Sequence, residues 1–300
     1  MQCHTVGSTR MKAGLVLSGG IAKGAYQIGA LKAISENLGN DYFNCISASS
    51  IGAISAFSFL TGQLDTFIDA FMSVPFKGGL SFIKYYTGKN NMSRLLDAFS
   101  YQIQIPSDFY ITNLCSPKLS INYNNLKGLQ DEPLRKRMES SVVLPVFCSP
   151  IEIDGIKHYD GAVVDNIPTF PLLEKNEDFV VACYFDRTDV FFENDDFNSK
   201  VYRLNFMDSG LLKDSFTFEE SSLREMISVG YETALGMIDE LELRKDDAQL
   251  TREKLREKYS NLKCSEKHIT GDIIVRGLNR INTKLARKRI INDSLTEGEK

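Results

Sequence analysis

Short apolar runs with the length of strands alternate along this chain with segments that have the apolar spacing of helices. The predicted strands cover residues 14–17, 43–47, 107–113, 119–123, 151–153, 157–159, 180–185 and 201–204. The predicted helices between them cover residues 25–37, 51–61, 64–74, 93–101 and 133–141. This alternation predicts an α/β fold with three layers, α/β/α, around a mainly parallel central sheet. In such folds the loops at the strand ends carry the active site.

A serine stands at the apex of one predicted strand-to-helix turn. The apolar run before it ends at Ile46, a second small and apolar stretch starts at Ala53, and Ser50 lies between them. A serine on such a sharp turn is exposed only if small neighbours let the backbone come close beneath it. The helix start also offers unpaired N–H groups and the positive end of the helix dipole. Ser50 is therefore a candidate nucleophile.

The same turn also allows a simpler interpretation. In the nucleophile-elbow pattern G-x-S-x-G, Gly52 fills the second glycine position, but Ala48 replaces the first. Alanine tolerates most tight turns, although a positive φ at Ala48 would cost energy. Alternatively, Ser49 or Ser50 is an ordinary N-cap of the helix that begins near Ile51.

A glycine-rich loop follows the first predicted strand. It comprises residues 18–24, with the sequence SGGIAKG, and it leads into a predicted helix. A strand, a glycine loop and a helix N-terminus together form a cradle for an anion, either a phosphate or a transient oxyanion. The loop fits neither the dinucleotide fingerprint nor the P-loop, because Ile21 blocks close backbone approach and no Lys-Ser/Thr pair follows. We interpret Gly19, Gly20 and Ile21 as an oxyanion hole, although a β-branched Ile21 cannot easily adopt a positive φ.

An aspartate ends the second strand of a predicted hairpin. The strands at residues 151–153 and 156–159 are separated by Asp154 and Gly155, a pair typical of two-residue turns. Asp160 follows the second strand and precedes Gly161. A carboxylate there can face a neighbouring loop, and a general base needs only hydrogen-bond reach of the serine proton. Asp160 is thus the candidate base for Ser50, whereas we interpret Asp154 as a turn residue.

The three motifs together resemble those of the patatin-like phospholipases, a family of lipid acyl hydrolases with a Ser-Asp dyad. The family's loop G-G-G-x-R/K-G is similar to residues 19–24, its elbow to residues 48–52, and its D-G-G/A motif to residues 160–162. The resemblance covers about residues 12–241 and implies a patatin-like fold with Ser50 and Asp160 as the dyad. The motif-supporting residues that it implies are Lys23, Gly24, Gly52 and Gly161.

The resemblance implies a serine acyl hydrolase that cleaves fatty-acyl esters of phospholipids or other glycerolipids through an acyl-enzyme. Asp160 would accept the Ser50 proton, and the glycine loop would hold the tetrahedral oxyanion. No cofactor and no metal are expected. Two alternatives remain: a thioesterase or short-chain esterase that acts on soluble substrates, and a catalytically weakened binding protein with the same fold.

The histidines offer an independent comparison of a dyad with a triad. His4 and His268 lie in polar or charged segments, whereas His158 precedes Asp160 by two residues on the same strand and could share its face. A Ser-His-Asp arrangement would need such a histidine as the base. His158 is the alternative base, and Asp160 is preferred.

Composition excludes some function classes and predicts a compartment. A net charge of -4 and a pI near 5.6 argue against a nucleic-acid-binding protein. The six cysteines are widely scattered, which favours reduced core thiols over a disulfide framework or a metal site. No stretch has the length of a membrane span, and residues 1–10 lack the apolar centre of a signal peptide. These features predict a cytoplasmic protein, with peripheral membrane contact as an alternative.

The C-terminal part differs in character from the rest. We predict a catalytic domain over residues 10–243 and a charged helical extension over residues 244–300. Within the extension, residues 272–292 form a predicted basic amphipathic helix that suits a transient contact with an anionic lipid surface or docking on its own domain. The aromatic segment 76–91 is predicted to be a lid or interfacial loop, or else a plain connection. The sequence predicts no oligomeric state.

Overall fold

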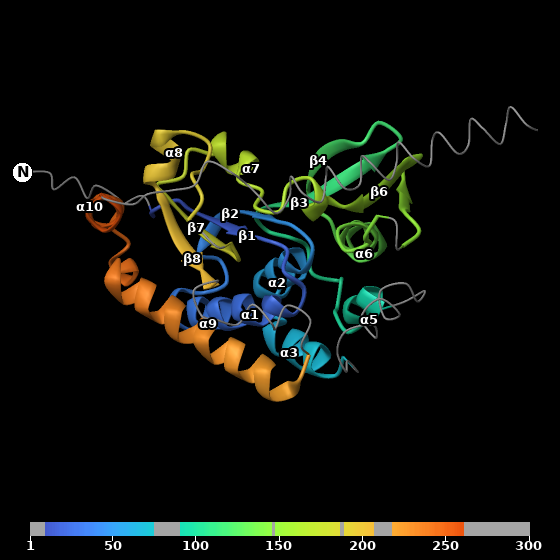
Figure 1. The fold of residues 1–300 in the computed structure, drawn as a ribbon, viewed down its shortest axis with the longest axis horizontal. Helices are drawn as coiled ribbons and strands as arrows, with labels where there is room; N and C mark the ends of the chain where they lie inside the picture. Colours follow the sequence, from blue (N-terminus) through green and yellow to red (C-terminus); the bar gives the residue numbers. More distant parts are fainter. Residues whose placement is uncertain (1–9, 75–90, 146–147, 187–188, 207–217, 261–300) are drawn as a thin grey trace, which may run out of the picture.

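The computed structural model describes residues 10–74, 91–145, 148–186, 189–206 and 218–260. Within these residues the chain folds around one eight-stranded sheet (Figure 1). The strands are β1 (Ala13–Leu17), β2 (Phe43–Ala48), β3 (Asp108–Ser116), β4 (Ser120–Asn125), β5 (Ile151–Ile153), β6 (Ile156–Asp160), β7 (Phe179–Tyr184) and β8 (Val201–Asn205). The sheet order is β5-β6-β3-β2-β1-β7-β8, and β4 also pairs with β3.

Five strands that are consecutive in this order run parallel to one another, namely β3, β2, β1, β7 and β8. The pairs β3–β4, β3–β6 and β5–β6 are antiparallel. The predicted α/β fold with a mainly parallel central sheet is therefore confirmed. The hairpin between β5 and β6 turns at Asp154 and Gly155, whose φ values of 53° and 75° fit the predicted two-residue turn.

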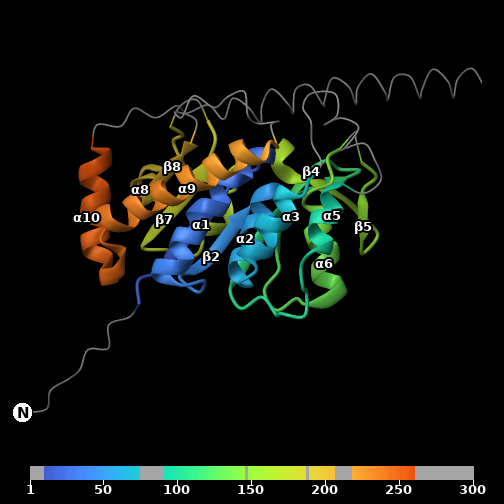
Figure 2. The ribbon, with the colours of Figure 1, turned by 90° about the horizontal axis from the view of Figure 1, so that it is seen from below.

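Helices cover both faces of the sheet. Successive residues of a strand point to opposite faces, so apolar residues on both faces form two separate cores. Leu15 and Leu17 belong to a large core with α1 (Gly24–Leu38), α2 (Ile51–Leu60), α3 (Leu64–Met72) and α9 (Glu220–Glu240). Val16, between the two leucines, belongs to a second core on the other face, with the short helices α7 (Phe170–Leu173) and α8 (Asp195–Ser199). Figures 1 and 2 show the two helical layers with the sheet between them.

Helices α1 and α9 touch backbone to backbone. A Cβ atom added at Gly29 of α1 would lie 1.9 Å from the carbonyl oxygen of Ile227, and one added at Gly230 of α9 would lie 2.1 Å from that of Tyr26. Glycine at both positions therefore permits a helix separation that no other residue allows. Because α1 follows the glycine-rich loop directly, this contact also fixes the helix that anchors that loop.

The remaining described helices border the sheet. Helix α6 (Asp131–Ser140) packs on the β5–β6 hairpin, and α5 (Asn91–Asp97) lies between α6 and α3. The helix predicted over residues 93–101 thus ends earlier, at Asp97. Helix α10 (Ala248–Tyr259), inside the predicted extension, packs against β7 and α8, and its Leu255 is buried in the large core. The basic helix 272–292 and residues 76–90 of the predicted lid lie outside the described residues.

None of the helices in the described residues combines the length and the apolar character that a bilayer crossing requires. The division at residue 243 stays a prediction. What the structure does show is that the first part of the predicted extension is tied to the sheet, since the Arg203 N–H donates to the hydroxyl of Tyr259 at 2.9 Å.

Candidate active site

Ser50 occupies a strained backbone position between β2 and α2. Its φ of 55° and ψ of -128° are rarely adopted by a residue with a side chain, and such strain persists only where the surrounding structure imposes it. Ser50 makes no side-chain cap of α2, so the N-cap interpretation does not apply to it. Its neighbour Ser49 is 0% exposed and donates its hydroxyl to the carbonyl oxygen of Asp165 at 2.7 Å. Of the two serines, Ser50 therefore has the hydroxyl that is available for chemistry.

Small residues under the turn make this geometry possible. A Cβ atom at Gly52 would lie 2.6 Å from the carbonyl oxygen of Leu17 and 2.7 Å from that of Ser18. The first turn of α2 thus rests on the end of β1. Ala48 is the last residue of β2 and is not among the positive-φ residues of the described chain. Ala48 therefore does not carry the strain that a positive φ would cause. The replacement of glycine by alanine at this position costs no backbone strain.

One edge of β3 brings Asp160 to the end of β2. Residues 110 and 111 of β3 pair with both β2 and β4, and residues 113–115 pair with both β4 and β6. Strands β2 and β6 must therefore share the edge of β3 opposite β4. On that edge Ala48 stands beside Ile111, and Asp160 stands beside Asn113, only about 7 Å further along the strand. Strand β6 thus ends where the turn to Ser50 begins.

Asp160 is buried, and its environment holds it partly neutral. Its side chain is 0% exposed, and its Oδ1 atom accepts the N–H of Ala162 at 2.9 Å. Burial raises the pKa of Asp160 to about 7, and the hydrogen-bonding influence of Ser50 and Ala162 opposes that rise. Its Oδ2 atom has no partner of good hydrogen-bond geometry among the described residues. Ser50 lies near enough to lower the pKa of Asp160, and hydrogen bonds at active sites commonly tighten only when substrate binds.

The glycine-rich loop lies against Ser50 and against Ala162, two residues after Asp160. The position of a Cβ atom at Gly19 is 3.0 Å from Cβ of Ser50 and 3.1 Å from Cβ of Ala162. The N–H of Gly19 donates to Oδ1 of Asn166 at 3.0 Å, so it is already engaged. Among the hydrogen bonds of the described residues, none is donated by the N–H of Gly20 or Ile21. These two N–H groups are thus available to an oxyanion, whereas Gly19 has a positioning contact.

Ile21 adopts the backbone conformation that its side chain disfavours. It opens η1 (Ile21–Lys23) with a φ of 56°, which is a genuine outlier for a β-branched residue. Ile21 therefore keeps the backbone conformation of the glycine that it replaces, and this conformation is strained for isoleucine. A residue held in this way signals that the loop is fixed by its surroundings.

A family model described as patatin-like phospholipase matches residues 15–173. The chain belongs to the patatin-like phospholipase family. Uncharacterized NTE family proteins from Mycobacterium bovis and Mycobacterium tuberculosis are 28% identical to it over 183 residues, which are 59% of this chain and 49% of theirs. The chain therefore spans about half the length of the curated relatives it matches. The crystal structure of VipD from Legionella pneumophila matches with 12% identity and a TM-score of 0.44, over 77% of this chain and 67% of VipD.

The other residues of the family's motifs take supporting places in this patatin-like domain. A Cβ atom at Gly24 would lie 2.7 Å from Cγ1 of Ile51, and one at Gly161 would lie 2.5 Å from the backbone of Thr112. Lys23 has its Nζ atom 5.6 Å from the ring centre of Phe185. Burial lowers the pKa of Lys23, and nearby Asp186 partly restores it. The glycines thus permit close packing, and Lys23 lies at the edge of the loop.

His158 takes no part in the arrangement around Ser50. Its Nδ1 atom pairs with the carbonyl oxygen of Ile156 at 2.9 Å, and burial lowers the pKa of its ring. Among the described residues, no hydrogen bond joins His158 to Ser50 or Asp160. Nor do the described residues contain a cluster suited to a metal ion, and their cysteines are free thiols.

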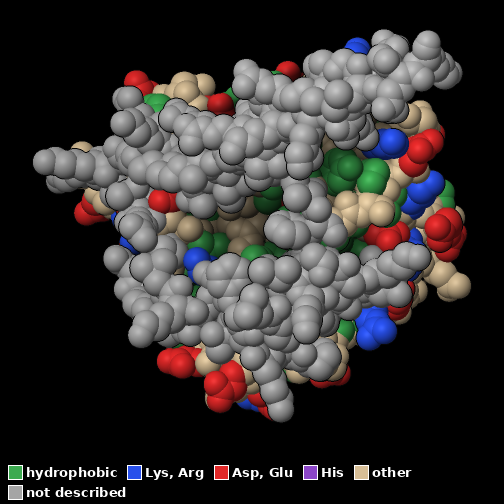
Figure 3. Space-filling model, turned by 45° about the vertical axis from the view of Figure 1, so that its right-hand side comes forward, with side chains coloured by type: hydrophobic (Ala, Val, Ile, Leu, Met, Phe, Trp, Pro, Cys, Tyr) green, Lys and Arg blue, Asp and Glu red, His purple; other side chains and the backbone are tan. Residues whose placement is uncertain are grey.

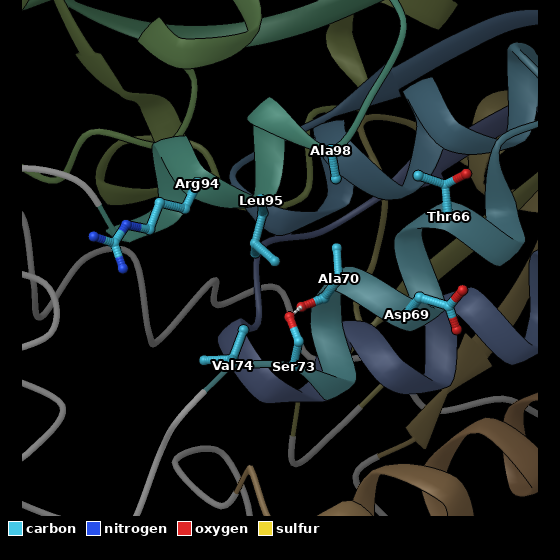
Figure 4. A pocket seen from close by; sticks show the side chains of 8 residues that line it. All are labelled: Thr66, Asp69, Ala70, Ser73, Val74, Arg94, Leu95 and Ala98. Atoms are coloured by element: carbon cyan, nitrogen blue, oxygen red, sulfur yellow. Dashed lines mark hydrogen bonds between the residues drawn. The ribbon is translucent and has the colours of Figure 1, made fainter.

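Two further features lie on the surface of the described residues, a cavity and a face with exposed hydrophobic side chains. A cavity of about 590 Å³ lies between α3 and α5, lined by Asp69, Arg94 and six other side chains (Figure 4). None of the lining residues belongs to the three motifs, so this cavity is not the candidate active site. Figure 3 shows hydrophobic side chains at the surface of one face, among charged and other side chains.

Proposed function

We propose that this patatin-like phospholipase is a serine acyl hydrolase that cleaves fatty-acyl esters of phospholipids or other glycerolipids. The observation that carries the proposal is that Ser50, which is strained and makes no side-chain cap of α2, lies near enough to the buried carboxyl of Asp160 to lower its pKa. Family membership supports the same reaction class. The proposal needs no metal or cofactor for this chemistry.

The first half of the reaction would form an acyl-enzyme. Asp160 accepts the proton of the Ser50 hydroxyl while Oγ forms a bond to the ester carbonyl carbon. The carbonyl oxygen becomes an oxyanion, which the N–H groups of Gly20 and Ile21 stabilise. The bond to the alcohol then breaks, and the proton held by Asp160 passes to the departing oxygen. The fatty-acyl group remains on Ser50.

The second half would release the fatty acid. A water molecule gives its proton to Asp160 and attacks the acyl carbon, and the same N–H groups hold the second oxyanion. Collapse of this intermediate returns the proton to Oγ of Ser50. Asp160 therefore alternates between base and acid, and a pKa of about 7 suits both roles near neutral pH.

An exposed phenylalanine supports a substrate with an apolar part. Phe170 is 51% exposed, and its ring stacks on that of Tyr123 with the centres 5.6 Å apart. The hydroxyl of Tyr123 donates to Oδ2 of Asp165, whose carbonyl holds Ser49. The exposed ring of Phe170 is therefore connected, through Tyr123 and Asp165, to the turn that carries Ser50.

The test is fluorophosphonate labelling together with fatty-acid release from phosphatidylcholine vesicles. We expect labelling and release in the wild type, loss of both in Ser50→Ala, and retention of labelling in Ser49→Ala. Ser49→Ala is the matched control, because it removes the neighbouring hydroxyl and keeps that of Ser50; the loss of the Ser49–Asp165 hydrogen bond should slow its labelling without abolishing it. Labelling that survives Ser50→Ala would overturn the assignment of Ser50 as the nucleophile. Labelling with turnover of soluble short esters or thioesters, but not of vesicles or micelles, would instead favour the soluble-substrate alternative.

A further inference from the structure

Asn166 holds the glycine-rich loop by both ends of its side-chain amide. Its Oδ1 atom accepts the N–H of Gly19 at 3.0 Å, and its Nδ2 atom donates to the carbonyl oxygen of Gly19 at 3.2 Å. One side chain thus satisfies both backbone groups of a residue that is 147 positions away in the sequence. Such a two-point contact fixes the orientation of the loop relative to Asn166 as well as the distance between them.

The preceding residue, Asp165, holds the nucleophile turn. Its carbonyl oxygen accepts the hydroxyl of Ser49 at 2.7 Å. Asp165 is fixed in turn, since its N–H donates to the carbonyl of Gly161 at 2.9 Å and its Oδ2 atom accepts the hydroxyl of Tyr123 at 2.7 Å. Two consecutive residues therefore connect the serine turn, the glycine loop and the segment that starts at Asp160.

We propose that Asp165 and Asn166 are positioning residues that set the oxyanion donors relative to the nucleophile. The inference rests on the proposed function, because it assigns a role within the Ser50 reaction. Gly20 and Ile21 follow Gly19 directly, so the direction of their N–H groups depends on how Gly19 is held. The positive φ of Ile21 would relax in a free loop, and the Asn166 contact opposes that relaxation. A misplacement of about 1 Å at such donors costs on the order of 100-fold in rate.

The test compares Asn166→Ala with Asn44→Ala. Oδ1 of Asn44 accepts the N–H of Ala13 at 3.0 Å, so it makes the same kind of bond at the opposite end of β1. Turnover is measured with p-nitrophenyl butyrate and with its thiono analogue, whose C=S accepts hydrogen bonds poorly. We expect Asn166→Ala to lower kcat for the oxygen ester about 10- to 100-fold with KM almost unchanged. The thiono ester should lose much less, because it gains little from the oxyanion donors.

A merely structural role for Asn166 predicts a different pattern. Both esters would then lose rate by the same factor, or Asn44→Ala would lower the oxygen-to-thiono rate ratio as much as Asn166→Ala does. Either result overturns the inference while Ser50 remains the nucleophile. Absence of any turnover or fluorophosphonate labelling in the wild type is a different result, because it contradicts the proposed function itself.

A second measurement needs no turnover, and its first part needs no variant. Amide hydrogen exchange in the wild type should show protection at Gly19 and faster exchange at Gly20 and Ile21, since only the first N–H has a partner. In Asn166→Ala the exchange of Gly19 should approach that of its two neighbours. Equal exchange at the three amides of the wild type would contradict the contact on which the inference depends.

Discussion

At the scale of single residues, backbone strain marks both halves of the site. Ser50 and Ile21 have φ values of 55° and 56°, in the region that favours glycine. Ala48, where the family's pattern has glycine, needs no such conformation. The two departures from the family's motifs therefore differ in kind: the alanine is neutral for the backbone, whereas the isoleucine is strained. Only the second has an energetic consequence that can be measured.

That consequence can be tested with two substitutions at one position. Ile21→Gly and Ile21→Ala both remove the side chain beyond Cβ, so they differ mainly in the cost of the positive φ. In an ordinary conformation alanine is the more stable of the two, but at a φ of 56° it carries the left-handed penalty of about 1 kcal/mol. We expect Ile21→Gly to have the larger free energy of unfolding in urea denaturation. A more stable Ile21→Ala would show that the loop does not hold this conformation.

At the scale of elements, local structure could be predicted from the sequence, but contacts between elements could not. Residue spacing predicted the strand before Ser50, the helix after it and the turn at Asp154, because these depend on neighbours in the chain. Strand β3 continues past the predicted end at residue 113 to Ser116, and this extension pairs with β6. The shared edge that places Asp160 beside the serine turn depends on pairing register between distant strands, which periodicity does not encode.

The contacts of Asn166 and the conformation of Ile21 were missed for the same reason. Asn166 lies within the residues that the family model matches, and its nearness to the candidate base Asp160 is the signal that the sequence offers. That its amide meets Gly19, however, follows only from the folded arrangement of the two loops. Ile21 was expected to avoid a positive φ because of its β-branch, and the fold imposes that conformation nevertheless.

The contact between α1 and α9 gives a prediction at the same scale. Gly230→Ala places a Cβ atom 2.1 Å from the carbonyl oxygen of Tyr26, so the helices must separate. We expect a loss of about 1–3 kcal/mol in the free energy of unfolding. Gly236→Ala is the matched control on the same helix, because nothing lies within 4 Å of its added Cβ. There we expect a gain of up to about 1 kcal/mol from helix propensity.

Equal effects at the two glycines would contradict the close helix contact. Thermal or urea unfolding measures both variants under one set of conditions. Because α1 anchors the glycine-rich loop, Gly230→Ala should also slow fluorophosphonate labelling, whereas Gly236→Ala should leave the labelling rate unchanged.

At the scale of the whole molecule, two buried carboxyl groups lie at opposite ends of the sheet. Asp160 is at the end that carries the candidate site, beside the end of β2. Glu177 precedes β7 and is 5% exposed, with its Cγ atom 3.3 Å from the Cβ position of Gly14 near the start of β1. Burial raises the pKa of each to about 7. The structure thus provides the candidate base and a matched buried carboxyl group at the other end of the sheet.

The raised pKa values predict how stability depends on pH. Between about pH 4 and pH 7 the folded state keeps protons that the unfolded state releases, so this contribution is complete below pH 4 and is lost as pH rises through 7. Asp160→Asn removes the buried charge. Its free energy of unfolding should therefore exceed that of the wild type at pH 8, by about 1.4 kcal/mol for each unit of raised pKa, and the difference should shrink toward pH 4. Glu177→Gln should show a gain in the same direction.

The dyad is tested most directly by the rate of fluorophosphonate labelling of Ser50 between pH 5 and pH 9 in the wild type, Asp160→Asn and Glu177→Gln. We expect the wild-type rate to rise through about pH 7, as Asp160 ionises. Glu177→Gln should follow the same profile, and Asp160→Asn should lose most of the rate and its pH dependence although it remains folded. A folded Asp160→Asn that labels Ser50 at the wild-type rate and with the wild-type profile would contradict the Ser50–Asp160 dyad.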